Sequence, residues 1–535
     1  MRKAFTIALT CALFLMAVGV QAQRVVDIPP TTDFDNPTDI YPYIMGDTLN
    51  DGSRTDNNTV YKLANGGFYI TSDVLVNKPE WPLVIEATDL TDLDLKPVLT
   101  VVPNASGTYP NIAFPEGDLT LRNLWIVAGE LGPLETPQWG QIRIMGENTT
   151  VIYEDLLLEK DRGGFIQFRA NGVKAYVNDC TFRNAGNRRE LQGNGRGFDG
   201  RNFTIDSLVV KNSIFYNIHD RMFRSMGSTG QHNYIEFDHN TIFNHFGRHG
   251  CFQFGNAAKE IVVTNNLIST PIMQGNSLVF CDEQSQVDND NLFVFTIDGA
   301  ADSVTTDFTF ANNNIFWTQD VLDYYASNDS VSKVDVYSST IVTKLGGEAA
   351  AEATYFTEVV EFNSVPQTIY QLLVDTYADP ASTDMFDIIC EDSARAGTPY
   401  DSKNLFNFST FDAGFDPVMY PLSAAGDVNG KAVGAVAVTG GVGIAKIEMD
   451  RVKMKLYPNP SHGQLTLEYM LERSGNVRVS ICDISGREQL VLLNEQRSQG
   501  ANLLSVDLSS ELPAGLYLID MQTESGRSVS KVILK

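Results

Sequence analysis

KNSIF (211–215), HNTIF (239–243) and NNNIF (312–316) belong to a set of seven phrases in which Asn or Asp precedes apolar residues. The other four are RNLWI (122–126), EDLLL (154–158), NDCTF (178–182) and NNLIS (265–269). Their second positions are Asn123, Asp155, Asp179, Asn212, Asn240, Asn266 and Asn313, at intervals of 32, 24, 33, 28, 26 and 47 residues. A short β-type unit that repeats at this interval predicts a solenoid with one coil per phrase.

The residue types in the phrases fit a coil of parallel strands. Asn tolerates the left-handed backbone conformation that a tight corner often needs. Stacked coils align equivalent side chains, so buried Asn amides can bond one another, while residues such as Ile214 and Ile242 stack inside. The alternative is that these Asn-containing pairs are ordinary loop residues. We expect an all-β, parallel-coil fold.

Changes in composition along the chain predict its domain organisation. A basic start, an apolar run and Val20-Gln21-Ala22 are typical of a signal peptide over residues 1–22. We expect a leader or cap over 23–57, coils over 58–438, a small-residue linker over 439–449 and an antiparallel β-sandwich over 450–535. Within the coils, 348–356 and 365–380 are helix candidates.

The charge is concentrated in the coil region. Residues 450–535 contain ten basic and ten acidic residues, whereas 23–449 contain 27 basic and 56 acidic residues, a net charge of −29. So acidic a surface disfavours nucleic acid as a partner, because phosphate binding needs clustered basic residues. Past the signal peptide, no apolar run is long enough to span a membrane. We therefore expect an exported protein, secreted or held at the outer cell surface, and a monomer.

Two resemblances follow from these segments. The tail resembles the C-terminal sorting domain of the type IX (Por) secretion system of Bacteroidetes-type bacteria, at LYPNP (456–460), ICDISGRE (481–488), LPAGLYLI (512–519) and the final KVILK. This resemblance implies the type IX machinery as a partner. The middle is similar to the right-handed parallel β-helix of the pectin-lyase-like superfamily, on NTVYKLANGGFYI and the N-x-I-F coils. Such helices host lyases, hydrolases, esterases and adhesins, so the function must be argued from a site.

One window of this acidic region is basic and titratable. It contains His219, His232, His239, His245 and His249, together with Arg221, Arg224 and Arg248. Counting nine residues from successive phrase positions aligns Arg188, Arg221 and His249, about 4.8 Å apart on adjacent coils. Counting eight places Asp220 beside Arg248. We predict a column on the outer wall, either a binding site or a solvated ion-pair ladder neutralised by Asp220, Glu236 and Asp238.

An anionic sugar polymer fits this chemistry. Cleavage of a uronic-acid chain by β-elimination requires a neutralised carboxylate, a base for the C5 proton and an acid for the leaving oxygen. Arg neutralises carboxylates through its planar fork, and His can act as a base. We therefore predict Arg248, His249 and Arg221 as catalytic residues, with substrate contacts from Arg188, Arg224, Asp220 and His219.

The resemblance to alginate and chondroitin lyases adds to this prediction. GRHG (247–250) is similar to an Arg-His-Gly stretch of those enzymes, which implies Arg248 as proton donor or carboxylate partner. The matching Lys one coil upstream is missing, because Arg224-Ser-Met-Gly stands there.

Four further hypotheses remain open from the sequence. Glycoside hydrolysis would need a carboxylate pair from Asp220, Asp238, Asp282 and Glu283. A Ca²⁺ ion would suit the oxygen ligands Asp282, Glu283, Asp288 and Asp290, although these residues also fit an acidic surface turn. The glycine-rich 187–202 segment is expected as a loop that could contribute Arg196 or Arg201. A non-catalytic, glycan-binding adhesin is the remaining hypothesis.

Overall fold

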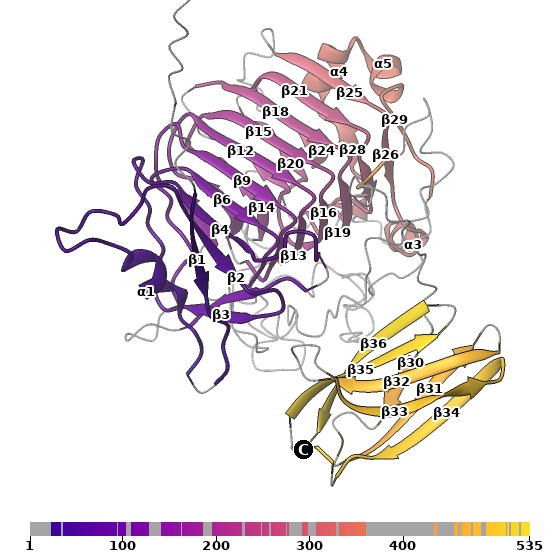
Figure 1. Ribbon diagram of the computed structural model, residues 1–535. Helices are drawn as coiled ribbons and strands as arrows, with labels where there is room; N and C mark the ends of the chain where they lie inside the picture. Colours follow the sequence, from indigo (N-terminus) through magenta and orange to yellow (C-terminus); the bar gives the residue numbers. More distant parts are fainter. Residues whose placement is uncertain are drawn as a thin grey trace, which may run out of the picture.

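The coil region is a right-handed parallel β-helix built from three sheets (Figure 1). The computed structural model describes residues 23–33, 36–93, 95–102, 109–127, 141–161, 163–185, 195–226, 230–247, 249–255, 258–273, 275–277, 292–297, 306–327, 331–359, 433–435, 454–457, 461, 463–471, 474–482, 488–509, 511–512, 515–523 and 526–534. The expected signal peptide and the helix candidate at 365–380 lie outside these residues.

Between residues 119 and 337, each coil contributes one strand to each sheet in turn. The first sheet consists of β1 (Arg24–Ile28), β2 (Thr59–Leu63), β4 (Leu83–Ala87), β6 (Leu119–Arg122), β9 (Thr150–Glu154), β12 (Val173–Asn178), β15 (Ile205–Lys211), β18 (His232–Asp238), β21 (Ala258–Thr264) and β25 (Asp307–Ala311). The second consists of β3 (Phe68–Thr71), β5 (Val98–Val101), β7 (Trp125–Val127), β10 (Leu157–Glu159), β13 (Thr181–Ala185), β16 (Ile214–Ile218), β19 (Thr241–His245), β22 (Leu267–Ser269), β26 (Asn313–Phe316) and β29 (Tyr355–Phe356). The third consists of β8 (Ile142–Ile144), β11 (Gly164–Phe168), β14 (Arg196–Asp199), β17 (Phe223–Arg224), β20 (Phe252–Gln253), β24 (Phe293–Thr296) and β28 (Asp335–Tyr337).

The repeated phrases form the corner between the first and second sheets. Asn123, Asp155, Asp179 and Asn212 have positive φ there, as do His239, Asn265 and Asn312 in the last three phrases. The left-handed residue is therefore the second position of the first four phrases but the first position of the last three. The prediction that the second positions of all seven phrases are equivalent is therefore wrong by one residue from HNTIF onward. Either of two consecutive polar residues can adopt the left-handed conformation that turns the corner.

The residue after the left-handed position points into the coil and forms the expected ladder. Asn266 Nδ2 donates to Asn313 Oδ1 at 2.9 Å, and Asn240 Nδ2 donates to Asn266 Oδ1 at 3.1 Å. The backbone N–H of Ser213 donates to Asn240 Oδ1 at 3.0 Å. Cys180 takes the same position one coil earlier, where it is 1% exposed. Buried amides thus satisfy one another along the axis.

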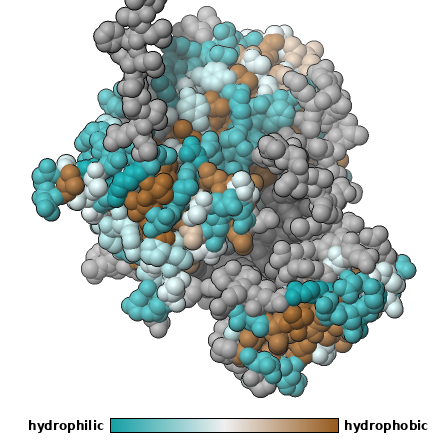
Figure 2. All heavy atoms as spheres, in the orientation of Figure 1, coloured by the Kyte–Doolittle hydropathy of each residue, from teal (hydrophilic) through white to brown (hydrophobic). Residues whose placement is uncertain are grey.

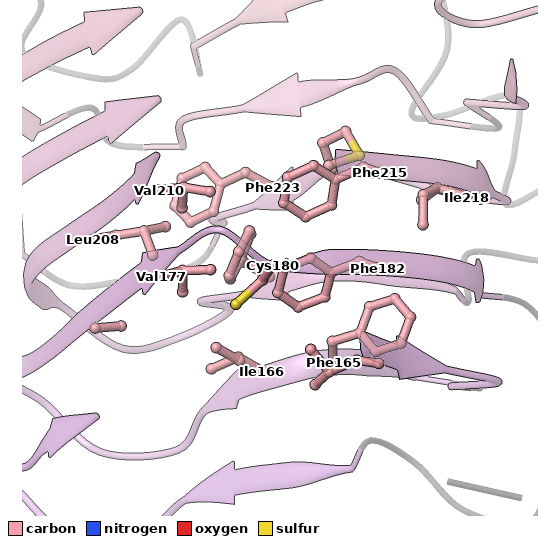
Figure 3. Packing of buried hydrophobic residues seen from close by; sticks show 14 of the residues in the cluster. Phe165, Ile166, Val177, Cys180, Phe182, Leu208, Val210, Phe215, Ile218 and Phe223 are labelled. Carbon is pink, nitrogen blue, oxygen red and sulfur yellow. The ribbon is translucent and has the colours of Figure 1, made fainter. Parts of the chain in front are cut away.

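Apolar side chains from all three sheets fill the helix. Phe198 from the third sheet lies 5.9 Å from Phe215 of the second and 6.0 Å from Phe237 of the first, measured between ring centroids. Phe182 and Phe215 stack at 4.6 Å on consecutive coils (Figure 3). Side chains on the outer face of the first sheet are mostly hydrophilic, with apolar ones interspersed (Figure 2). Apolar side chains that point inward and hydrophilic ones that point outward alternate along a strand with one buried face.

The ends of the helix differ from the regular coils. The segment expected as a leader provides β1, which pairs in parallel with β2, and the short helix α1 (Ile40–Met45). The late coils carry α3 (Gln319–Ser327), α4 (Ser339–Leu345), α5 (Glu348–Glu352) and an antiparallel pair, β23 (Asn276–Ser277) with β27 (Val331–Ser332). The helix candidate at 348–356 is therefore helical only in its first half, since β29 follows. Gly434 donates its N–H to the carbonyl of the corner residue Asn265 at 2.7 Å, and the Ala435 N–H donates to Thr241 Oγ1 of β19 at 3.0 Å, so residues 433–435 are tied to this corner and to the second sheet.

The C-terminal region has the antiparallel pairing of a sandwich. One sheet consists of β30 (Met454–Tyr457), β31 (Gln464–Leu471) and β34 (Gly500–Asp507). The other consists of β33 (Glu488–Arg497), β32 (Gly475–Cys482), β35 (Gly515–Thr523) and β36 (Gly526–Leu534). Buried residues such as Leu467, Val479 and Ile519 form a core of their own. None of the helices in the described part of the chain is both long and apolar enough for a membrane crossing.

Candidate functional site

A polar row runs along the outer face of the third sheet. In β14, β17, β20 and β24 an inward Phe is followed by an outward polar residue, and in β11 Ile166 takes the place of the Phe, because successive side chains point to opposite faces. The inward row is Phe198, Phe223, Phe252 and Phe295, and the outward row in register is Gln167, Asp199, Arg224, Gln253 and Thr296. Asp199 and Arg224 are only 1% and 7% exposed. Charged groups in this row are therefore withdrawn from solvent.

Six residues of this wall form what we call the third-sheet charge cluster: Arg196, Asp199, Asp220, Arg221, Arg224 and His249. Arg196 begins β14 and Arg224 ends β17. Asp220 and Arg221 lie in the connection from β16 to β17, and His249 lies in the corresponding connection one coil later. The cluster thus spans three consecutive coils.

Asp220 is the centre of the cluster. Its Oδ2 accepts from Arg196 Nε at 2.9 Å and from Arg221 Nη1 at 3.3 Å, and its Oδ1 lies 2.9 Å from His249 Nδ1. Burial alone would raise the pKa of Asp220, but the charges of Arg221, His249 and Arg196 hold it well below its usual range. Asp220 is therefore ionised, and the shared proton must belong to His249 Nδ1.

Asp199 forms the second ion pair of the cluster. Arg224 donates to it through Nε at 2.9 Å and Nη2 at 2.6 Å, a two-point guanidinium–carboxylate pair. Arg196 Nη1 lies 3.8 Å from the same carboxylate. Burial opposes ionisation of Asp199, yet the charges of Arg224 and Arg196 lower its pKa. Burial lowers the pKa of Arg196 to about 10, so its guanidinium stays charged at neutral pH.

Of the other histidines in the basic window, His245 interacts with the backbone and the charge of Asp220, whereas His219 and His232 have other partners. His219 is 1% exposed and stacks on Phe246 with ring centroids 5.2 Å apart. His232 accepts the Ile205 N–H on Nδ1 and bonds the Ser225 hydroxyl through Nε2. Burial lowers the pKa values of both His232 and His245 to about 4. These two are neutral residues of the interior.

The structure brings Asp220, Arg221 and His249 together, in an arrangement that differs from the predicted column. The rule placed Arg221 opposite His249 on the outer wall, whereas Asp220 is the residue that bonds His249. Asp220 and Arg221 are 0% and 5% exposed, so they are buried rather than presented on an open surface. Arg224, predicted as a substrate contact, is engaged by Asp199.

Several predicted residues lie outside the described part of the chain. These are Arg188 and Arg248 and the four proposed calcium ligands Asp282, Glu283, Asp288 and Asp290. Across the described segments, no group of three or more His, Cys, Asp or Glu residues has the geometry of a metal site. The calcium ion remains an expectation.

Sequence reasoning missed Asp199 and gave Arg196 only a minor role. A second repeat could have found both: Arg196-Gly-Phe-Asp, Arg221-Met-Phe-Arg and Gly250-Cys-Phe-Gln align with one another in the third sheet. Each has the central Phe inside the coil and the next residue outside.

Residues 455–535 match the secretion system C-terminal sorting domain. The chain is thus a secreted parallel β-helix protein with a C-terminal sorting domain, exported by type IX secretion to the cell surface or the extracellular space. No curated protein shows significant sequence similarity to it.

A structural match is the tailspike protein gp49 from Acinetobacter baumannii bacteriophage Fri1, described as a capsular polysaccharide depolymerase. The match is 9% identical, covers 89% of this chain and 81% of the tailspike, and has a TM-score of 0.19. A likeness this remote says nothing about activity.

Proposed function

We propose that this protein binds an extracellular anionic polysaccharide of the uronic-acid type at the third-sheet charge cluster and cleaves it by β-elimination. The observation that carries the proposal is the sign of the cluster. Three guanidinium groups face two carboxylates, with His249 at the edge, in a region whose net charge is −29. A local excess of positive charge on so acidic a protein favours an anionic ligand.

The chemistry would divide among the residues as follows. Arg221 would neutralise the uronate carboxylate, which makes the C5 proton more acidic. His249 would take that proton, the C5–H electron pair would form the C4=C5 double bond, and the C4–O bond would break. The leaving oxygen keeps the electron pair of the broken C4–O bond and takes a proton, for which Arg248 is our candidate donor.

Glycoside hydrolysis fits the cluster less well. It needs one carboxyl group that is protonated at working pH. The pKa values of Asp199 and Asp220 are both lowered, so neither group can serve as that acid. Asp238 lies at the end of β18 in the first sheet, on another face of the helix from Asp220. These two carboxylates are therefore not candidates for the pair that hydrolysis needs.

A second candidate function is glycan binding without cleavage, as in an adhesin. The burial of the cluster favours it, because Arg224 already has a two-point partner and Arg196 is 5% exposed. On this hypothesis the paired charges of the third-sheet charge cluster have a structural role, and sugar carboxylates bind only at the edge of the cluster.

One experiment separates the two functions. The purified protein is incubated with alginate, pectin and chondroitin, and the absorbance of the unsaturated product is followed. A lyase produces this signal with at least one polymer, and His249→Ala or Arg248→Ala abolishes it. Binding without product from any of the polymers would refute the lyase and support the adhesin. The Arg122→Ala variant, which removes a half-buried arginine of the first sheet, serves as a matched loss of one positive charge.

A further inference from the structure

The turn that carries His249 is an insertion in its coil. Ile218 pairs with His245 and Phe223 pairs with Phe252, so the later coil has two additional residues between its second-sheet and third-sheet strands. The turn is closed by the Gly250 N–H, which donates to the Gly247 carbonyl at 3.0 Å.

The glycines at both ends of this turn have a structural reason. Gly247 and Gly250 have φ values of 72° and 98°, which disfavour other residues. A side chain at Gly247 would also meet the Ile272 Cα at 2.7 Å. The turn is thereby pressed against the next coil, and the His249 side chain, 12% exposed, is placed over Asp220 of the preceding coil.

Asp220 binds its partners differently from Asp199. Both oxygens of Asp199 accept from one guanidinium, that of Arg224, and Oδ1 also accepts the Arg201 backbone N–H at 3.2 Å. Asp220 instead divides its oxygens: Oδ2 receives the arginines of two coils, and Oδ1 receives the histidine of a third. A carboxylate that only neutralised an arginine could bind one guanidinium through both oxygens, as the neighbouring Asp199 does with Arg224.

This division fixes the histidine tautomer. An ionised carboxylate can only accept, so Nδ1 of His249 carries a proton, and in the neutral ring the lone pair is then on Nε2. Arg196 holds the other oxygen through Nε and also donates to the Gly163 carbonyl at 3.2 Å, which anchors the guanidinium to an earlier coil. The carboxylate therefore cannot rotate without breaking a buried, charge-assisted hydrogen bond.

We propose that Asp220 and Arg196 are positioning residues for His249: Asp220 sets its tautomer and orientation, and Arg196 holds Asp220 in place. The inference deepens the proposed function, because a base for the C5 proton needs its lone pair on Nε2. Arg196 acts through Asp220 and need not touch the substrate.

The test reads the tautomer directly, without reference to activity. The chain contains six histidines, so the ¹⁵N spectrum of the histidine-labelled full-length protein can be assigned to His249 with the His249→Gln variant. At pH 7.5 we expect a protonated Nδ1 and an unprotonated Nε2. Asp220→Asn should shift His249 toward a mixture of tautomers, while Asp199→Asn, a matched loss of a buried carboxylate that His249 does not contact, should leave its nitrogen shifts unchanged.

Arg196→Lys is the second variant, because Asp220→Asn leaves two buried guanidinium groups without their carboxylate and could prevent folding. It retains the charge but lacks Nε, and the His249 nitrogen shifts should move toward those of a freely rotating ring. A protonated Nε2 in the wild-type protein, or wild-type shifts in Arg196→Lys, would overturn the proposal.

A kinetic measurement then links the two proposals. If a polymer is turned over, Arg196→Lys should lower kcat at least tenfold with KM changed by less than about threefold, since a misdirected base loses part of its catalytic contribution. Equal loss in kcat and in binding would count against positioning. If no polymer is turned over by the wild-type protein, the proposed lyase fails, and the tautomer experiment still decides the role of Asp220 and Arg196.

Discussion

Asn266→Ala tests whether the buried amide ladder holds the coils together. The Asn266 side chain takes part in four hydrogen bonds. Its Oδ1 accepts from the Asn240 backbone N–H at 2.9 Å and from Asn240 Nδ2 at 3.1 Å, and its Nδ2 donates to the Phe237 carbonyl and to Asn313 Oδ1, both at 2.9 Å. Asn266 is 1% exposed, so water cannot easily replace these partners.

The magnitude follows from the groups that would be left without a partner. In Asn266→Ala the backbone N–H of Asn240 loses its acceptor, and the Phe237 carbonyl loses a donor. Asn240 Nδ2 keeps the Val210 carbonyl at 2.9 Å, and Asn313 Oδ1 keeps the Asn266 backbone N–H at 3.1 Å. Two orphaned backbone groups at roughly 1–3 kcal/mol each give a loss of about 2–6 kcal/mol in the free energy of unfolding.

Urea unfolding followed by far-UV circular dichroism measures this loss. Cys180→Ala is the matched control, because Cys180 takes the same position in a coil without neighbouring amides. We expect the control to cost about 1 kcal/mol, as a small buried hydrophobe. If Asn266→Ala lowers the stability no more than Cys180→Ala does, the ladder is not what holds these corners, and our account of the repeated phrase is wrong.

Three further predictions concern other parts of the helix. The folded state keeps His232 and His245 neutral, with pKa values of about 4. The contribution of these neutral side chains to the free energy of unfolding is therefore fully present above pH 6.5 and decreases as the pH falls from 6.5 toward 4. The loss should be on the order of 3 kcal/mol per histidine, measured by thermal unfolding at a series of pH values, and His232→Gln should flatten the curve. His239→Asn should be neutral or stabilising, whereas His239→Val should cost about 1–2 kcal/mol, because φ is 54° at this corner; a tolerated valine in urea unfolding would contradict the corner model. Gly434→Val should release residues 433–435 and increase proteolysis there, since φ is 83° and its Cβ would lie 2.8 Å from Thr241 Oγ1; an unchanged cleavage rate would show that the contact is dispensable.

The fold can be predicted from the sequence more completely than the candidate functional site. The Asn-then-apolar phrase identified the coils because a left-handed corner followed by an inward side chain constrains residue type at two adjacent positions. It could not say whether His239 or Asn240 turns the corner, since both are polar. Nor could it reveal the two-residue insertion before Phe252, because connections between the second and third sheets have no constrained residue type. For these reasons Asp220, rather than Arg221, was found opposite His249.

The constant corner has a consequence for how this protein can change. From Asn123 onward, one or two residues join each first-sheet strand to its second-sheet strand, while the interval between left-handed residues varies from 24 to 47. The variation in coil length thus lies in the parts of each coil outside this corner. These parts can lengthen without disturbing the stacking of the corner residues. The corner between the first and second sheets is thus constant, whereas the other connections of the coil differ in length. Segments of different length and charge can be exchanged there one at a time, so a change of ligand would not require a new core.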